Sequence, residues 1–91
     1  MTDSELLTML KIDCGITTTA FDERLAQYVE TAEAEITREG ATLADTASDS
    51  QLIVMYAAWL WRKRDTGEGM PRMLRYAINQ RVFSQKMSSG A

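Results

Sequence analysis

The sequence contains no histidine and only one cysteine, Cys14, among its 91 residues. One thiol cannot form an intramolecular disulfide, and without histidine or further cysteines there is no typical zinc site. The absence of histidine also removes the usual base that activates a hydroxyl or thiol nucleophile. We therefore expect no catalytic residue, no metal site and no cofactor, and we interpret Cys14 as a small apolar residue near a helix end in a reducing cytosol.

Long hydrophobic runs are also missing. The longest apolar stretch covers residues 52–61, which is about half of the roughly 20 residues needed to span a bilayer. The first residues after Met1 are polar and acidic, unlike the basic and then apolar start of a secretory signal. We expect no membrane association.

Proline occurs once, at Pro71, and no segment of useful length alternates between apolar and polar residues. This pattern excludes most β architectures and predicts an all-α fold. A chain of 91 residues forms one core. We expect a compact bundle of about four helices over residues 1–84, followed by a flexible C-terminal tail at 85–91.

Periodicity and capping residues set the expected helix boundaries. The first helix starts at a cap among residues 2–4 and ends at Gly15, and the second starts at Thr18 or Thr19 and ends at Gly40. After a polar connector, the third runs from about 50 to 65, with its cap at Ser48 or Asp49. The fourth begins near Pro71. The second helix is long and amphipathic, with an apolar stripe at Phe21, Leu25, Tyr28, Val29, Ala32 and Ile36, and the fourth carries a stripe at Met70, Met73, Leu74, Ala77, Ile78 and Val82.

The third helix is apolar all round over residues 52–61. Such a helix needs cover on nearly every side, and three short neighbours can cover only part of it. Two alternatives remain open at this point: the aromatic residues Tyr56, Trp59 and Trp61 are covered within the chain, or some of them are covered by another subunit.

Charge is divided unevenly along the chain. Residues 1–50 carry a net charge of −8 and residues 51–91 carry +5, although the whole chain carries only −3. Opposite net charges on the two halves of the chain favour head-to-tail contact between copies and therefore self-assembly.

The charged clusters also have simpler interpretations. Glu30, Glu33 and Glu35 lie close together on the second helix, but a helix spreads neighbouring positions around its surface, so a solvated acidic face is favoured over metal or acid-base chemistry. The basic set could contact nucleic acid, neutralise helix C-termini, or pair with the acidic second helix of a neighbour. Its members are Arg62, Lys63, Arg64, Arg72, Arg75, Arg81 and Lys86.

The order of these features resembles the gp6-like family of head-tail connectors (adaptors) from tailed bacteriophages. The resemblance covers nearly the whole chain and rests on the Leu6–Lys11 opening followed by Gly15-Ile16, the second-helix stripe, the Trp59–Arg64 end of the third helix, and the Met70–Tyr76 segment that runs into Asn79, Arg81, Phe83 and Lys86. It implies an α-helical, non-enzymatic virion protein that assembles in the host cytoplasm as a ring, expected to hold twelve copies, beneath the portal protein. The ring would extend the DNA channel, without reading the DNA sequence, and join the head to the tail or to the next connector.

We expect a subunit or partner interface in which the acidic second helix of one copy meets the basic end of the third helix, or the fourth helix, of the next. The residues assigned to it are Glu30, Glu33, Trp59, Trp61, Arg62, Arg64, Arg72, Arg75, Arg81, Phe83 and Lys86. The alternative function is a small regulatory protein that binds nucleic acid through its basic C-terminal half.

Overall fold

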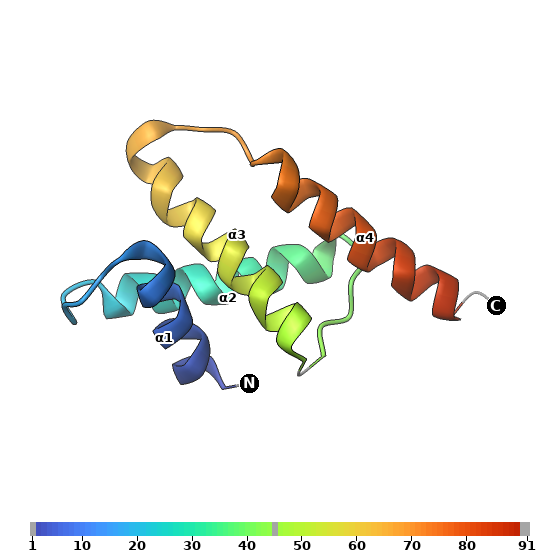
Figure 1. Ribbon diagram of the computed structural model, residues 1–91, viewed down its shortest axis with the longest axis horizontal. Coiled ribbons are helices and arrows are strands. Elements are labelled where there is room, and N and C mark those ends of the chain that lie inside the picture. The colour runs from blue at the N-terminus through green and yellow to red at the C-terminus, as the bar shows by residue number, and fades with distance from the viewer. Residues whose placement is uncertain (1, 45, 90–91) are drawn as a thin grey trace.

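The computed structural model describes residues 2–44 and 46–89, with side chains through Gln85, and this part of the chain forms four helices and no strand (Figure 1). The helices are α1 (Asp3–Cys14), α2 (Asp22–Arg38), α3 (Ala47–Thr66) and α4 (Arg72–Ser89). The expected all-α bundle is confirmed. The molecule is elongated and measures 47 × 28 × 17 Å along its principal axes.

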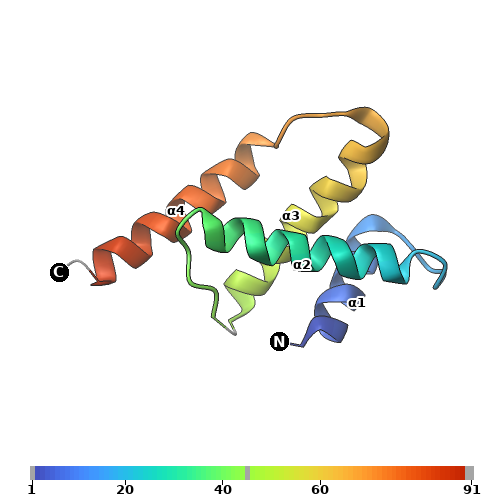
Figure 2. The same ribbon diagram turned by 180° about the vertical axis from the view of Figure 1, so that it is seen from behind.

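The core lies among α1, α2 and α3. Residues Leu25, Val29, Ala32 and Ile36 of α2 are buried, which confirms the predicted stripe, and Figure 2 shows α2 crossing α3. Leu6 and Leu10 of α1 pack into the same cluster, and α3 supplies most of the rest. The buried part of α3 comprises Leu52, Ile53, Val54, Tyr56, Ala57, Ala58 and Trp59.

Glycines and one capping box fix the ends of α1 and α3. The Thr2 hydroxyl accepts from the backbone N–H of Glu5, whose carboxylate accepts in turn from the Thr2 N–H at 3.1 Å. Gly15 and Gly67 end α1 and α3 with φ of 69° and 66°, a left-handed conformation that favours glycine. These helix ends agree with the sequence analysis.

Two helix starts differ from their predicted positions. Neither Thr18 nor Thr19 caps α2, which follows Phe21 without any side-chain cap. The cap of α3 is Thr46, whose hydroxyl accepts from the N–H of Asp49, so α3 starts at Ala47, about three residues earlier than predicted. Asp49 therefore lies inside the first turn, and its carboxylate is available for other partners.

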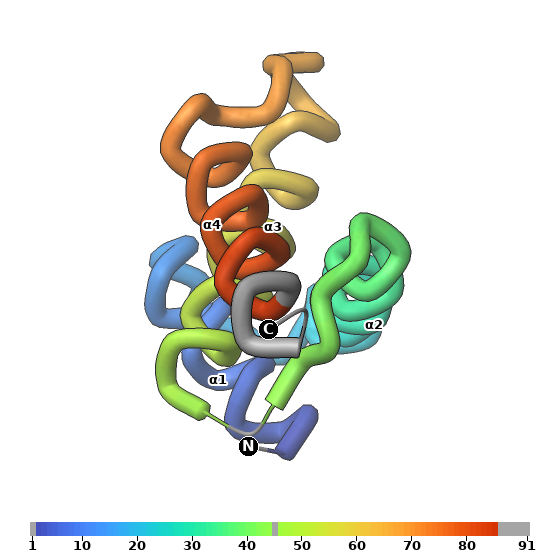
Figure 3. Tube along the Cα trace, turned by 90° about the vertical axis from the view of Figure 1, so that its right-hand side faces the viewer, coloured from blue at the N-terminus to red at the C-terminus, as the bar shows by residue number. Residues whose placement is uncertain are grey.

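Helix α4 packs on α3 and extends past the other helices (Figures 1 and 3). Its buried contacts come from Leu74 and Ile78, both at most 1% exposed, while Met73 of the predicted stripe is 72% exposed. The helix continues to Ser89, so the segment expected to be a flexible tail from Gln85 is helical over residues 85–89. Residues 90 and 91 of that tail lie outside the described residues.

Candidate assembly surfaces

The basic residues at the end of α3 are engaged within the chain. The Arg64 guanidinium lies 3.7 Å from the centre of the Trp61 ring and 3.1 Å from the Asp65 carboxylate. Lys63 lies 4.6 Å from the centre of the Trp59 ring, and Arg62 is 4.0 Å from Glu68. These side chains form local pairs on an exposed helix end, each of which typically contributes about 1 kcal/mol or less.

Arg75 of α4 pairs with Glu39, the residue that follows α2. One nitrogen of its guanidinium lies 2.6 and 2.8 Å from the two carboxylate oxygens. Both side chains are partly exposed. The pair joins the acidic and basic halves of one molecule, rather than two molecules.

Arg81 holds α4 to the start of α3. Its Nε donates to Oδ1 of Asp49 at 2.7 Å, and its Nη2 donates to Oδ2 at 3.1 Å and to the Thr42 carbonyl at 2.8 Å. The Asp49 carboxylate also accepts from the N–H of Ala44 at 2.7 Å. The side-chain amide of Gln85 also bonds to Thr42: its oxygen accepts from the Thr42 N–H, and its nitrogen donates to the Thr42 hydroxyl.

Electrostatics agree with this geometry. The side chain of Asp49 is 3% exposed and that of Arg81 is 27% exposed. The hydrogen bonds from Arg81 lower the pKa of the Asp49 carboxyl despite its burial, and the same hydrogen bonds raise the pKa of Arg81. The sequence assigns Arg75 and Arg81 to a contact between copies, whereas the structure gives each an acidic partner in its own chain.

The aromatic residues of α3 are covered without a second subunit. Tyr56 and Trp59 are 7% and 8% exposed, their rings meet edge to face at 5.4 Å, and the Trp59 indole N–H donates to the Glu68 carbonyl. Trp61 is half-buried and meets the rings of Phe21 and Tyr28 edge to face at 5.2 and 6.5 Å. Trp59, which the sequence assigned to the interface, is therefore covered within its own chain and offers little surface to a partner, whereas part of Trp61 stays accessible.

An acidic patch lies where the start of α1 meets the middle of α2. We define it as Asp3, Glu30 and Glu33, and within the described chain none of the three forms an ion pair. Burial raises the pKa of Glu33, and the negative charges of Asp3 and Glu30 raise it further. Glu35, by contrast, pairs with Arg38 at 2.8 Å. Of the predicted acidic face, Glu30 and Glu33 are therefore the members that carry uncompensated charge.

Beside this patch runs an open groove of about 390 Å³. Glu33 and Glu5 line its rim, and Leu6, Leu43 and Ile53 contribute apolar walls. The Glu5 carboxylate is part of the capping box, and its hydrogen bonds with Thr2 lower its pKa. The groove thus combines negative charge with apolar surface.

A second surface lies on α4 and was missed in part by the sequence analysis. Met73, Tyr76 and Phe83 are 72%, 60% and 60% exposed, and their spacing of three and seven residues places them along one side of the helix. We call these three residues the α4 stripe. Phe83 was predicted as an interface residue and Met73 as part of the apolar stripe of this helix. Tyr76 entered only as the end of the Met70–Tyr76 segment, although helical spacing could have placed it beside Met73 and Phe83.

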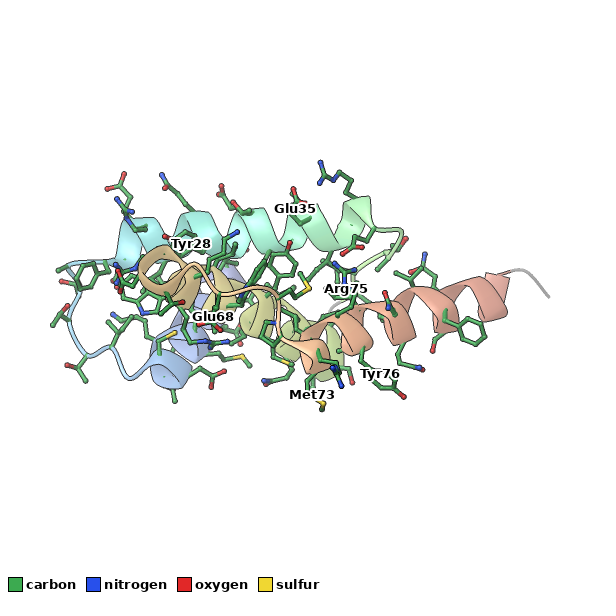
Figure 4. All side chains as sticks on the ribbon, turned by 90° about the horizontal axis from the view of Figure 1, so that it is seen from above. Tyr28, Glu35, Glu68, Met73, Arg75 and Tyr76 are labelled. Carbon is green, nitrogen blue, oxygen red and sulfur yellow. The ribbon has the colours of Figure 1, made fainter. Side chains whose placement is uncertain are left out.

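Arg72, at the start of α4, is exposed and has no acidic partner among the described residues. It lies next to Met73 in the chain and one helical turn from Tyr76. The side chain of the remaining predicted residue, Lys86, lies outside the described side chains. Figure 4 shows Met73 and Tyr76 on the side of the molecule away from α2.

The other candidates have simple roles. Cys14 is half-buried, and desolvation raises the pKa of its thiol, as expected for a packed rather than an activated thiol. In the part of the chain that the structure describes, no cluster of three potential metal ligands occurs. None of the described helices has the length and hydropathy to span a bilayer. Comparisons with protein-family models, curated proteins and solved structures found no match to this chain.

Proposed function

We propose that this chain is a structural subunit that assembles with copies of itself and performs no catalysis. In the form that the sequence resemblance implies, it is a head-tail connector of a tailed bacteriophage. Copies form a ring, expected to hold twelve, that lies beneath the portal protein, surrounds the DNA channel and receives the tail or the next connector. Its place is then the head-tail interface of the virion, after assembly in the host cytoplasm.

The observation that carries the self-assembly part is the α4 stripe. Three large apolar side chains are exposed on one side of a helix whose opposite side already packs against α3. Fully burying one such side chain is worth about 1.5–3 kcal/mol, so covering the stripe with another protein surface is favourable. An exposed apolar patch with a flanking charge is typical of an interaction site.

The geometry favours assembly over the nucleic-acid alternative. Arg62, Arg64, Arg75 and Arg81 already lie against acidic groups of their own chain. A phosphate backbone would have to compete with these carboxylates, which lowers the gain from releasing counterions. Some of the opposite charges of the two halves therefore pair with each other within one molecule.

The test is the absolute mass in solution, measured by light scattering across protein and salt concentration. We expect a discrete oligomer, which for the connector would be twelve times the 10.2 kDa monomer. A mass of one monomer at every concentration would contradict self-assembly. Retention on DNA that falls steeply with added salt would instead support the nucleic-acid alternative.

A further inference from the structure

We propose that the α4 stripe of one copy, together with Arg72, docks against the acidic patch and its groove on a second copy. This inference rests on the proposed self-assembly and goes beyond it by naming both surfaces. The occupant of the groove is therefore a basic, apolar helix face supplied by the same chain.

The donor surface is a helix face that carries Arg72, a positive charge without an acidic partner among the described residues. Met73 and Tyr76 lie within one turn of Arg72, and all three are exposed. Methionine adapts to imperfect surfaces, and tyrosine combines apolar area with a polar tip, so both suit a protein interface. Phe83 extends the same apolar surface toward the C-terminal end of α4.

The acceptor surface has the complementary charge. Asp3, Glu30 and Glu33 are close enough for the first two to raise the pKa of the third, and within the described residues no base pairs with them. The neighbouring groove is lined by Leu6, Leu43 and Ile53, of which Leu43 is half-buried while Leu6 and Ile53 are at most 5% exposed. A partner that brings one cation and apolar side chains would relieve the repulsion and cover the accessible part of Leu43 in a single contact.

The two surfaces cannot meet within one molecule. Met73 and Tyr76 of the α4 stripe lie on the side away from α2 in Figure 4, whereas the acidic patch includes two residues of α2 itself. Contact between different surfaces of two copies is heterologous, and it leaves one free stripe and one free groove at the ends of every open chain of subunits. Such a contact forms a ring when the rotation between copies closes.

Two single charge reversals test the contact, because each is compatible with the fold. Arg72→Glu places an acid in the first turn of α4, where the helix dipole favours it. Glu33→Arg places a base between Asp3 and Glu30, where it relieves repulsion. Arg24→Glu is the matched control, because Arg24 is an exposed arginine in the first turn of α2 and forms no ion pair with the residues that the structure describes.

We expect each single reversal to weaken association by about tenfold or more, as measured by light scattering or sedimentation, because like charges then meet at the interface. The double variant Arg72→Glu with Glu33→Arg should recover association, and so should an equimolar mixture of the two single variants. Arg24→Glu should associate like the unmodified protein. Circular dichroism should show the same helix content in all four variants.

An independent substitution tests the apolar part. Tyr76→Ala should weaken association, whereas Ile12→Ala should not, although Ile12 on α1 is 74% exposed and thus at least as accessible. If the unmodified protein associates but the reversals have no effect, or the double variant does not recover, this contact is wrong and the proposed function stands. If the unmodified protein is monomeric throughout, self-assembly fails and this contact fails with it.

Discussion

The α1–α3 body and α4 are held in place by different forces. The body is a continuous apolar cluster in which Leu10, Leu25, Ala32 and Ile36 have no exposed surface. Among the described side chains of α4, Leu74 and Ile78 are buried in this cluster and Ala77 and Val82 pack partly against it. Polar contacts with residues 39–49 add to this attachment. Apolar burial supplies most of the stability but little direction, whereas hydrogen-bonded ion pairs have strict geometry.

This difference explains how α4 can keep an apolar face in solvent. Because α3 is the helix on which α4 mainly packs, a narrow apolar stripe is enough for burial, and the ion pairs of Arg81 and Arg75 help to set the orientation of α4. The stripe of Met73, Tyr76 and Phe83 consequently points outward. The polar contacts of α4 thus orient the α4 stripe toward solvent.

The largest expected effect is in the body. Leu25→Ala removes a side chain with no exposed surface and leaves a cavity, so we expect a loss of about 3–5 kcal/mol in the free energy of unfolding, measured by urea denaturation. The control is Ile12→Ala on α1, which is 74% exposed and should change stability by less than about 0.5 kcal/mol. Similar losses at both positions would refute the assigned core.

The next effect concerns the attachment of α4. Arg81→Met leaves the buried Asp49 carboxylate with the Ala44 N–H as its remaining donor, so we expect a loss of about 2–3 kcal/mol. Amide hydrogen exchange should increase first in α4. The double variant Arg81→Met with Asp49→Leu should be more stable than Arg81→Met alone, because no buried charge is then left without a partner. If Arg81→Met lost no stability, the ion pair would not be what holds α4.

Lowering the pH should weaken the same contact between Asp49 and Arg81. The pKa of Asp49 is lowered in the folded chain, so its contribution is present above the unfolded pKa of about 3.9 and is lost as pH falls through the folded value. The pKa of Glu33 is raised, so this group has the opposite sign and disfavours the fold when it ionises. In urea denaturation, Asp49→Asn should lose less stability than the unmodified protein as the pH falls below about 5. Glu33→Gln should be more stable than the unmodified protein at neutral pH. A steeper acid loss in Asp49→Asn would reverse this assignment.

The smallest expected effect is at the exposed pair of Glu39 and Arg75. Glu39→Gln should cost about 0.5 kcal/mol, because both side chains are partly exposed and water replaces much of the interaction. Salt should reduce the difference between this variant and the unmodified protein, as seen by denaturation at low and high ionic strength. A loss as large as that of Arg81→Met would mean that the two ion pairs contribute equally.

The sequence pattern predicted correctly those features that depend on a single helix. The α2 stripe and the glycine ends of α1 and α3 follow from helical spacing and from the conformations that glycine favours. The predicted starts of α2 and α3 were wrong because several nearby threonine, serine and aspartate residues can cap a helix, and neighbouring packing selects among them. Thr46 caps α3, which leaves Asp49 for Arg81.

The sequence by itself determined an all-α chain, an apolar third helix, an amphipathic second helix and the division of charge between its two halves. Only the tertiary structure decided that Trp59 is covered within the chain, that Arg75 and Arg81 pair with their own Glu39 and Asp49, and that Met73 faces solvent. The physical reason is that helical periodicity reports which residues share one face, whereas burial and charge pairing depend on which distant element lies opposite that face.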